Sequence, residues 1–279
     1  MGRSRASGRR DRVVEGAAAS PDARARSPVP EMLVNGAGFE HDSRATSVPE
    51  TVGPDLATPS PSVLRLRLFR QLRSMRFRPW HIVDAGVYQG DWSRGASAVS
   101  PEARYTLIEP QAEMRPHLDA FCAGVADARW LPVGVAGEIG ERVFTVTSPG
   151  DGRGFIYPDS YAREHGLEQR PVQLRNLDEI CADRPMPEIV KLDAEGLEVE
   201  AMAGARSLIG QTELFFLEAA LFDFGGRPLF HGVLDTMRRL GYEFYDITDL
   251  NRRPIDMALG MVELAFARRA GLLRDHARW

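Results

Sequence analysis

From Trp80 onward, short apolar segments alternate with amphipathic segments, and this alternation predicts a mostly parallel sheet with helices on its faces. Several apolar segments are uninterrupted, which is typical of strands buried on both sides. The predicted strands are His81–Asp84, Tyr105–Glu109, Arg129–Val135, Glu188–Asp193, Glu213–Glu218, Tyr242–Ile247 and Met261–Ala267. The predicted helices are Trp92–Val99, Arg115–Ala123, Leu197–Ile209 and Pro228–Leu240, the last two with Gly210 and Gly241 as C-caps. The fold class is therefore α/β, with a mostly parallel seven-stranded sheet.

Two segments depart from simple alternation. Only a loop, Thr248 to Gly260, separates the last two strands, which predicts a C-terminal antiparallel hairpin at the sheet edge. Residues 140–175 form an insertion with one probable strand, Arg142–Thr147, and a stretch rich in Gly and Pro. Long irregular segments over an α/β sheet often serve as substrate loops, and Tyr157, Asp159 and Tyr161 are candidates to shape a substrate pocket there.

The chain before the sheet has two parts. Residues 1–60 are rich in Arg, Ala, Ser, Gly and Pro without sustained periodicity, which predicts a disordered tail. No apolar stretch follows Arg9 and Arg10, so export through a twin-arginine signal is not indicated. Residues 62–77 predict a basic helix at the start of a domain spanning 61–279. We favour a packed helix with a solvated arginine face, while contact with a membrane surface, an acidic carrier or a phosphorylated substrate stays open.

Composition narrows the classes of function. The net charge of −4 gives no electrostatic reason to expect nucleic acid, and no apolar run is long enough to span a membrane. Cys122 and Cys181 lie far apart in no metal-ligand spacing, which favours a reduced, cytoplasmic setting. Oligomerisation stays open. Lys191 is the single lysine among 35 basic residues, which suggests that a compact ammonium is required at that position.

The strongest local motif is HIVDAGVYQG, in which a strand enters a turn and then a helix. Asp84 ends the strand, Gly86 allows a tight turn, and Gly90 allows close approach at the helix start. Tyr88 stands where a dinucleotide-binding turn requires a glycine, which argues against a pyrophosphate ligand. Glu109 ends the next strand, where an acidic side chain accepts hydrogen bonds from ribose hydroxyls. Together these residues predict a nucleoside site.

At this point the chain resembles the FkbM family of methyltransferases. The resemblance covers roughly residues 80–267 and rests on the blocks VDAGVYQG, TLIEP, NLDEI and IVKLDAEGLEVEAMAGA, extended by FFLE and GYEF. It implies a Rossmann-like class I methyltransferase fold and S-adenosylmethionine as donor. It also implies O-methylation of a hydroxyl on a sugar or a natural product of secondary metabolism. The family usually has Asn and often Ala in the first loop, where this chain has Tyr88 and Val87.

Four acidic residues are expected at the carboxyl ends of neighbouring strands, where open α/β sheets bind ligands. Lys191 and Asp193 share one face of the fourth strand by alternation, and Glu195 follows at its exit. Glu218 ends the next strand, and Asp84 ends the first. Crowded carboxylates perturb one another's pKa, so one of them can serve as a base for a hydroxyl.

Several alternatives remain. Asp193, Glu195 and Glu218 are also a possible Mg²⁺ set, although we favour metal-free catalysis, and Lys191 is equally compatible with a purely charge-neutralising role. His165 and His231 are weaker candidates for the base, and Asp178 is the expected N-cap of the helix that follows it.

Two other functions compete with O-methylation of a small-molecule or glycan acceptor. One is an S-adenosylmethionine-binding module that has lost catalysis and acts through a partner at the basic helix. The other is an NAD-dependent Rossmann reductase, which the missing middle glycine disfavours.

Overall fold

The computed structural model describes residues 61–147, 154–155, 157, 159–223 and 226–275. These residues belong to one compact unit, Leu56–Trp279. The predicted tail, residues 1–60, lies outside the described residues, as does part of the Gly- and Pro-rich stretch of the insertion.

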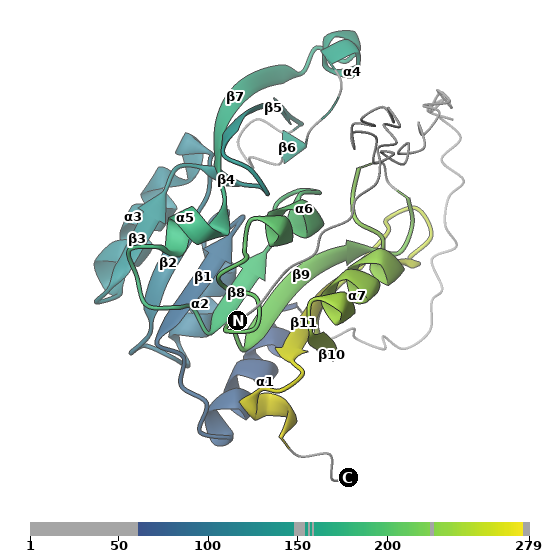
Figure 1. Ribbon diagram of the computed structural model, residues 1–279. Helices are drawn as coiled ribbons and strands as arrows, with labels where there is room; N and C mark the ends of the chain where they lie inside the picture. Colours follow the sequence, from purple (N-terminus) through teal and green to yellow (C-terminus); the bar gives the residue numbers. More distant parts are fainter. Residues whose placement is uncertain (1–60, 148–153, 156, 158, 224–225, 276–279) are drawn as a thin grey trace, which may run out of the picture. The chain divides into compact units, whose positions relative to one another are not determined.

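The main sheet has seven strands in the order β10-β11-β9-β8-β1-β2-β3 (Figure 1). β11 runs antiparallel to both of its neighbours, and the other neighbouring pairs are parallel. The predicted fold class and the C-terminal hairpin are therefore confirmed. The strands are β1 (His81–Ala85), β2 (Arg104–Ile108), β3 (Ala128–Leu131), β8 (Ile189–Leu192), β9 (Leu214–Ala220), β10 (Tyr242–Arg252) and β11 (Leu259–Arg268).

Helices cover both faces of this sheet (Figure 1). On one face lie α1 (Pro61–Ser74), α2 (Asp91–Ser97) and α3 (Arg115–Gly124), preceded by the short η1 (Ala112–Met114). On the other face lie α5 (Leu177–Cys181), α6 (Glu198–Ala203) and α7 (Phe230–Arg239). A second short turn, η2 (Leu272–Arg274), follows β11. None of the helices in the described part of the chain has the length and apolar character needed to cross a membrane.

The basic helix α1 packs against the sheet through one apolar stripe. Leu68, Phe69 and Leu72 are buried in the same core as Phe216 of β9, while Arg67 and Arg70 are exposed. This agrees with the predicted packed helix and with a solvated arginine face at Arg67 and Arg70, whereas Arg65 and Arg73 form ion pairs.

The hairpin strands are longer than predicted, so the expected loop from Thr248 to Gly260 was wrong. β10 continues to Arg252 and β11 begins at Leu259, which leaves a short connection between them. The register shifts three times along β10, and these irregularities break the simple alternation by which strand length is recognised in a sequence.

Two predicted caps were also wrong. α6 ends at Ala203 with Gly204 as its C-cap, not at Ile209 with Gly210. A side chain at Gly204 would meet Asn176 and the backbone oxygen of Gly137, so only glycine fits there. Asn176, not Asp178, caps α5 by accepting a hydrogen bond from the Glu179 amide at 2.9 Å.

The insertion is largely a second sheet. The predicted strand Arg142–Thr147 is confirmed as part of it, and the other strands of the insertion were not predicted. Its strands have the order β4-β7-β5-β6, and α4 (Asp159–Glu164) lies beyond them (Figure 1). The predicted strand Arg129–Val135 divides at Pro132, which has no backbone N–H for a ladder, between β3 and β4. The bounds of the second sheet are β4 (Gly134–Val135), β5 (Gly140–Val146), β6 (Gly154–Phe155) and β7 (Glu168–Arg175).

Candidate functional site

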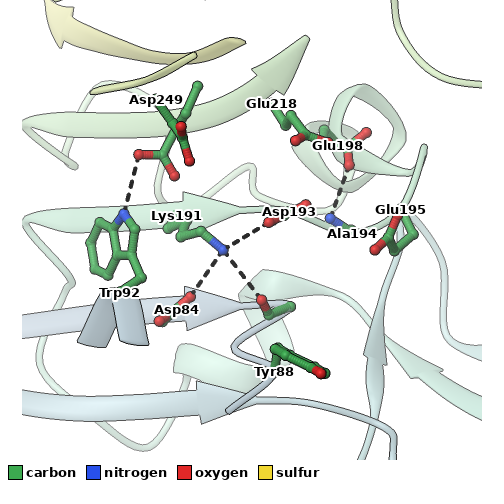
Figure 2. Close-up of polar contacts among 12 residues, drawn as sticks. Asp84, Tyr88, Trp92, Lys191, Asp193, Ala194, Glu195, Glu198, Glu218 and Asp249 are labelled. Carbon is green, nitrogen blue, oxygen red and sulfur yellow. Dashed lines mark hydrogen bonds and ion pairs between the residues drawn. The ribbon is translucent and has the colours of Figure 1, made fainter. Parts of the chain in front are cut away.

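Four carboxylates form a row across neighbouring strands β8, β9, β11 and β10. Glu263 is the register partner of both Glu218 and Asp249. Asp193 directly follows β8, beside Glu218, because Leu192 pairs with Leu217. Directly opposed residues of a sheet present their side chains on the same face. We call Asp193, Glu218, Glu263 and Asp249 the carboxylate row; Figure 2 labels three of its members.

The row lines a cavity of about 150 Å³ at the strand ends. This volume is below the roughly 300–1,000 Å³ of pockets that hold drug-sized ligands, so the cavity is too small to enclose a whole ligand of that size. The remaining lining residues are Arg65, Gly86, Val87, Tyr88, Asp91, Trp92 and Lys191.

Lys191 of β8 lines the cavity and links β8 to the end of β1 and the turn after it (Figure 2). Its ammonium lies 3.2 Å from Asp193 Oδ2, 3.4 Å from Asp84 Oδ1 and 3.2 Å from the carbonyl oxygen of Gly86. Burial disfavours the ammonium, but the charges of Asp193 and Asp84 outweigh burial and raise the pKa of Lys191 above its ordinary value. The lysine therefore stays charged and holds the turn and Asp193 in place, and it cannot accept a proton.

Asp84 is fully buried below the turn. Its Oδ2 accepts a hydrogen bond of 2.6 Å from Ser93 Oγ, and its Oδ1 faces Lys191. In the described structure its contacts are thus to Lys191 and α2, so any effect on a bound donor passes through the position of the lysine and the turn.

The turn after β1 is pressed against the end of β8. Gly86 has φ of 73°, and a Cβ atom on it would lie 1.7 Å from the backbone oxygen of Asp193. Gly90 is the N-cap of α2 with φ of 91°. Tyr88 also has a left-handed φ of 47°, a conformation that suits Asn better than an aromatic residue.

Glu109 lies beside this turn, directly after β2, with 3% of its surface exposed. Its Oε2 accepts a hydrogen bond from the Tyr88 amide at 2.9 Å, and its Oε1 accepts one from the Gln111 amide at 3.1 Å. Burial raises the pKa of Glu109 to about 7, against the lowering effect of these two hydrogen bonds. Each carboxylate oxygen keeps a lone pair that a hydroxyl can use.

Arg227 stands between two of the predicted catalytic acids. Its guanidinium forms ion pairs with Glu195 and with Glu218. Glu195 has a left-handed φ of 52° and contacts Arg227 outside the lining of the cavity, whereas Glu218 is part of that lining. Burial and the charge of Asp193 raise the pKa of Glu218 to about 9 and that of Glu195 to about 7, opposed by Arg227.

The suggested Mg²⁺ set is not supported. In the described ranges, no three His, Cys, Asp or Glu side chains converge in a way that would hold a metal ion. The physical reason at Glu195 and Glu218 is that the Arg227 guanidinium already binds both carboxylates. A guanidinium has no lone pair to offer a metal, so these side chains do not fit a Mg²⁺ site.

Sequence reasoning missed one wall of the cavity. Arg65 of α1 lies 3.5 Å from Asp249 Oδ2 and 3.6 Å from Glu263 Oε1. That Glu263 oxygen also accepts hydrogen bonds from Thr248 Oγ1 at 2.6 Å and Trp92 Nε1 at 3.3 Å. One signal was available: Glu263 stands inside an apolar strand, and a buried glutamate requires a partner. The register of the hairpin and the packing of α1 had to be known to find that partner.

The candidate histidines and insertion residues lie elsewhere. His165 and His231 are exposed, and neither lines the cavity. In the insertion, Tyr161 stacks between Tyr157 and His165, with ring centroids 4.5 Å and 4.1 Å apart. These side chains form an aromatic stack at α4, and none of them lines the cavity.

Glu198 is a further buried acid near the row, with 1% of its surface exposed. One of its oxygens accepts hydrogen bonds from the amides of Ala194 at 2.9 Å (Figure 2) and Gly196 at 3.1 Å. The other oxygen has no hydrogen-bond partner among the described residues. Burial and the charge of Asp193 raise the pKa of Glu198 to about 7.

The Glu198→Gln variant should therefore be more stable than the wild type at pH 8, with little difference at pH 5. Between about pH 4.5 and pH 7 the folded protein keeps a proton that the unfolded chain releases, so stability falls as pH rises, by up to about 3 kcal/mol. Urea unfolding from pH 5 to pH 8 measures this, with the exposed Glu138→Gln as control. Equal pH slopes in Glu198→Gln and wild type would contradict it.

Comparison with known proteins identifies the family. The family described as "Methyltransferase FkbM domain" matches residues 84–244, which is more than half of the chain. The chain belongs to the FkbM methyltransferase family. This FkbM methyltransferase is thus an S-adenosylmethionine-dependent enzyme with the Rossmann-like class I fold. The matched segment starts at Asp84 and includes Glu109, Asp193 and Glu218. It does not contain Arg65, nor Asp249 and Glu263 of the C-terminal hairpin.

Solved structures similar to the FkbM methyltransferase are distant in sequence. A precorrin-6y C5,15-methyltransferase from Geobacter metallireducens is 11% identical, with a TM-score of 0.40 over 78% of this chain and 93% of that one. A 1,6-didemethyltoxoflavin-N1-methyltransferase from Burkholderia thailandensis is 12% identical, with a TM-score of 0.41 over 74% and 79%. A magnesium protoporphyrin IX methyltransferase from Synechocystis is 11% identical, with a TM-score of 0.43 over 74% and 83%. No curated protein matches the chain.

Proposed function

We propose that this FkbM methyltransferase transfers a methyl group to a hydroxyl of a sugar or natural-product acceptor. The observation that carries the proposal is the position of Glu218 in the cavity beside Asp193, with a pKa raised to about 9. A carboxylate with such a pKa is a far stronger base than an ordinary glutamate, and a hydroxyl acceptor requires a base.

The donor side is built from the turn after β1 and the end of β2. Glu109 is held by the amides of Tyr88 and Gln111 with lone pairs remaining, which suits the two hydroxyls of a ribose. The close approach of Gly86 to Asp193 and the charge of Lys191 keep this edge rigid. When bound, S-adenosylmethionine supplies a methyl group on a sulfonium that is already a good leaving group.

On the acceptor side, Glu218 removes the hydroxyl proton. Asp193 lies next to Glu218 in the row, and its negative charge favours the cationic end of the donor and orients the acceptor hydroxyl. Lys191 stays protonated and fixes Asp193, with Asp84 as its second counter-ion. Arg227 holds Glu218 through its ion pair, and Glu195 holds Arg227 from the other side.

Product analysis tests the atom that is methylated. The enzyme is incubated with donor carrying an isotope-labelled methyl group and with matched alcohols, sugars and amines, and the products are examined by NMR and mass spectrometry. We expect label on oxygen of a hydroxyl acceptor, with one S-adenosylhomocysteine formed per methyl transferred. Label found only on nitrogen or a carboxylate would refute O-methylation while leaving the enzyme a methyltransferase.

A further inference from the structure

The wall of the cavity at Arg65, Asp249 and Glu263 is built from segments outside the family match. Arg65 lies in α1, Asp249 in β10 and Glu263 in β11, whereas the match spans residues 84–244. The donor-side residues Gly86 and Glu109 fall inside the match. The wall at α1 and the hairpin is therefore the part of the cavity that lies outside the family match.

Strand order separates this wall from the donor side. Glu109 follows β2 and Gly86 follows β1, on one side of β8, while Glu263 and Asp249 belong to β11 and β10 on the other side. Glu218, the proposed base, lies between the two groups on β9. A molecule that presents a hydroxyl to Glu218 from the side opposite the donor therefore extends toward Arg65 and Asp249.

Arg65 and Asp249 offer complementary hydrogen-bonding groups at this wall. The Arg65 side chain is 13% exposed, and its nitrogens lie 3.5–3.6 Å from the two carboxylates, beyond the usual hydrogen-bond length. Its Nε has no hydrogen-bond partner within the described ranges, although the atom is buried. Asp249 Oδ1 accepts a hydrogen bond from the Leu250 amide, and Asp249 Oδ2 faces the Arg65 guanidinium. Because Arg65 and Asp249 both line the cavity, the terminal nitrogens of the guanidinium can donate to a ligand there, and the carboxylate can accept from it.

We propose that Arg65 and Asp249 bind a vicinal diol of the acceptor, next to the hydroxyl that is methylated, and so determine acceptor specificity. Each hydroxyl of a diol both donates and accepts a hydrogen bond, so one hydroxyl accepts from Arg65 while its neighbour donates to Asp249. Trp92 and Thr248 keep Glu263 in place, and Glu263 in turn positions Arg65. This inference rests on the proposed O-methylation for the place of the reacting hydroxyl, whereas the diol site itself can be tested by binding alone.

The test uses trans-cyclohexane-1,2-diol and cyclohexanol as probes of the full-length protein saturated with S-adenosylhomocysteine. NMR titration gives the affinity of each probe for the wild type and for Arg65→Ala, Arg65→Lys and Asp249→Ala. Arg67→Ala is the matched control, because Arg67 is exposed on the same helix. Calorimetric titration with S-adenosylhomocysteine shows whether each variant keeps its donor site.

We expect the wild type and Arg67→Ala to bind the diol at least tenfold more tightly than cyclohexanol. Arg65→Ala and Asp249→Ala should lose this preference while S-adenosylhomocysteine affinity stays within threefold. Arg65→Lys keeps the positive charge but not the planar guanidinium with its paired N–H donors, so it should lose most of the preference for the diol. Equal binding of the two probes by the wild type, or an unchanged preference in both alanine variants, would overturn the inference. Failure of O-methylation would show separately, as absence of label on oxygen with the diol preference intact.

Discussion

The Glu218→Gln variant should lose about 10²- to 10⁴-fold in kcat, the usual contribution of a positioned general base. Glutamine has nearly the shape of glutamate but cannot accept the acceptor's proton. Glu218 lines the cavity rather than the donor edge, so affinity for S-adenosylhomocysteine should change little. Single-turnover transfer of labelled methyl, together with calorimetric donor binding, measures both quantities. Glu138→Gln, an exposed control, should behave as the wild type.

The same role predicts an alkaline pH profile. Glu218 acts only when ionised, and burial together with the charge of Asp193 raises its pKa to about 9. The value of kcat/KM should therefore rise about tenfold per pH unit from pH 7 and level off near pH 9. Arg227→Gln removes the cation that favours the carboxylate, so the rising limb should move to higher pH. A wild-type profile that is flat from pH 7 to pH 9, or full activity in Glu218→Gln, would rule out Glu218 as the base.

The second large effect is expected at Glu109, where Glu109→Gln should weaken binding of S-adenosylhomocysteine about 10- to 100-fold. Hydrogen bonds to a charged group contribute about 1.5–3 kcal/mol each, and the change removes the charge. The glutamine NH₂ would also face one of the backbone amides that now donate to the carboxylate, from Tyr88 and Gln111. Calorimetry at pH 8 measures the loss. Glu113→Gln, an exposed acid four residues further along, is the matched control.

Donor binding should also depend on pH through Glu109. Its pKa of about 7 in the free protein means that the carboxylate is largely protonated at pH 6 and largely ionised at pH 8. A ribose that donates to the carboxylate favours the ionised form, so affinity should fall about tenfold from pH 8 to pH 6. In Glu109→Gln this pH dependence should disappear. If the affinity of Glu109→Gln still changed with pH, another group would be responsible for the pH dependence, and the ribose would not be bound by Glu109.

The buried strands and the turn after β1 could be predicted because their signals are local. Apolar runs such as those around Val83 and Val190 are hydrophobic on both faces, so buried parallel strands follow from the chain itself. The motif from Asp84 to Gly90 predicts a strand, a turn and a helix start by the conformational needs of its glycines. Lys191 and Asp193 share a face because the side-chain period of a strand is two residues, and their contact confirms this.

Other features depend on contacts between segments far apart in the chain. The second sheet pairs β5 with β7, and Pro171 within β7 obscures that strand in the sequence. Asp178 looks like an N-cap but accepts hydrogen bonds from the amides of Arg206 and Ser207. The residue type shows that a side chain is able to cap a helix. Which backbone amide comes within hydrogen-bond distance of it depends on the tertiary fold.

The amino-acid sequence by itself determined the α/β class and the acidic strand ends at Asp193 and Glu218, and it predicted a nucleoside-binding edge at Glu109. Only the tertiary structure decided that Arg227 takes the place suggested for Mg²⁺ and that Arg65 closes the cavity against Asp249. The physical reason is the distance along the sequence over which each signal acts. Hydrophobic periodicity and backbone conformation depend on residues only a few positions apart. The charges that neutralise a buried carboxylate come instead from whichever segment the packing brings within a few ångströms.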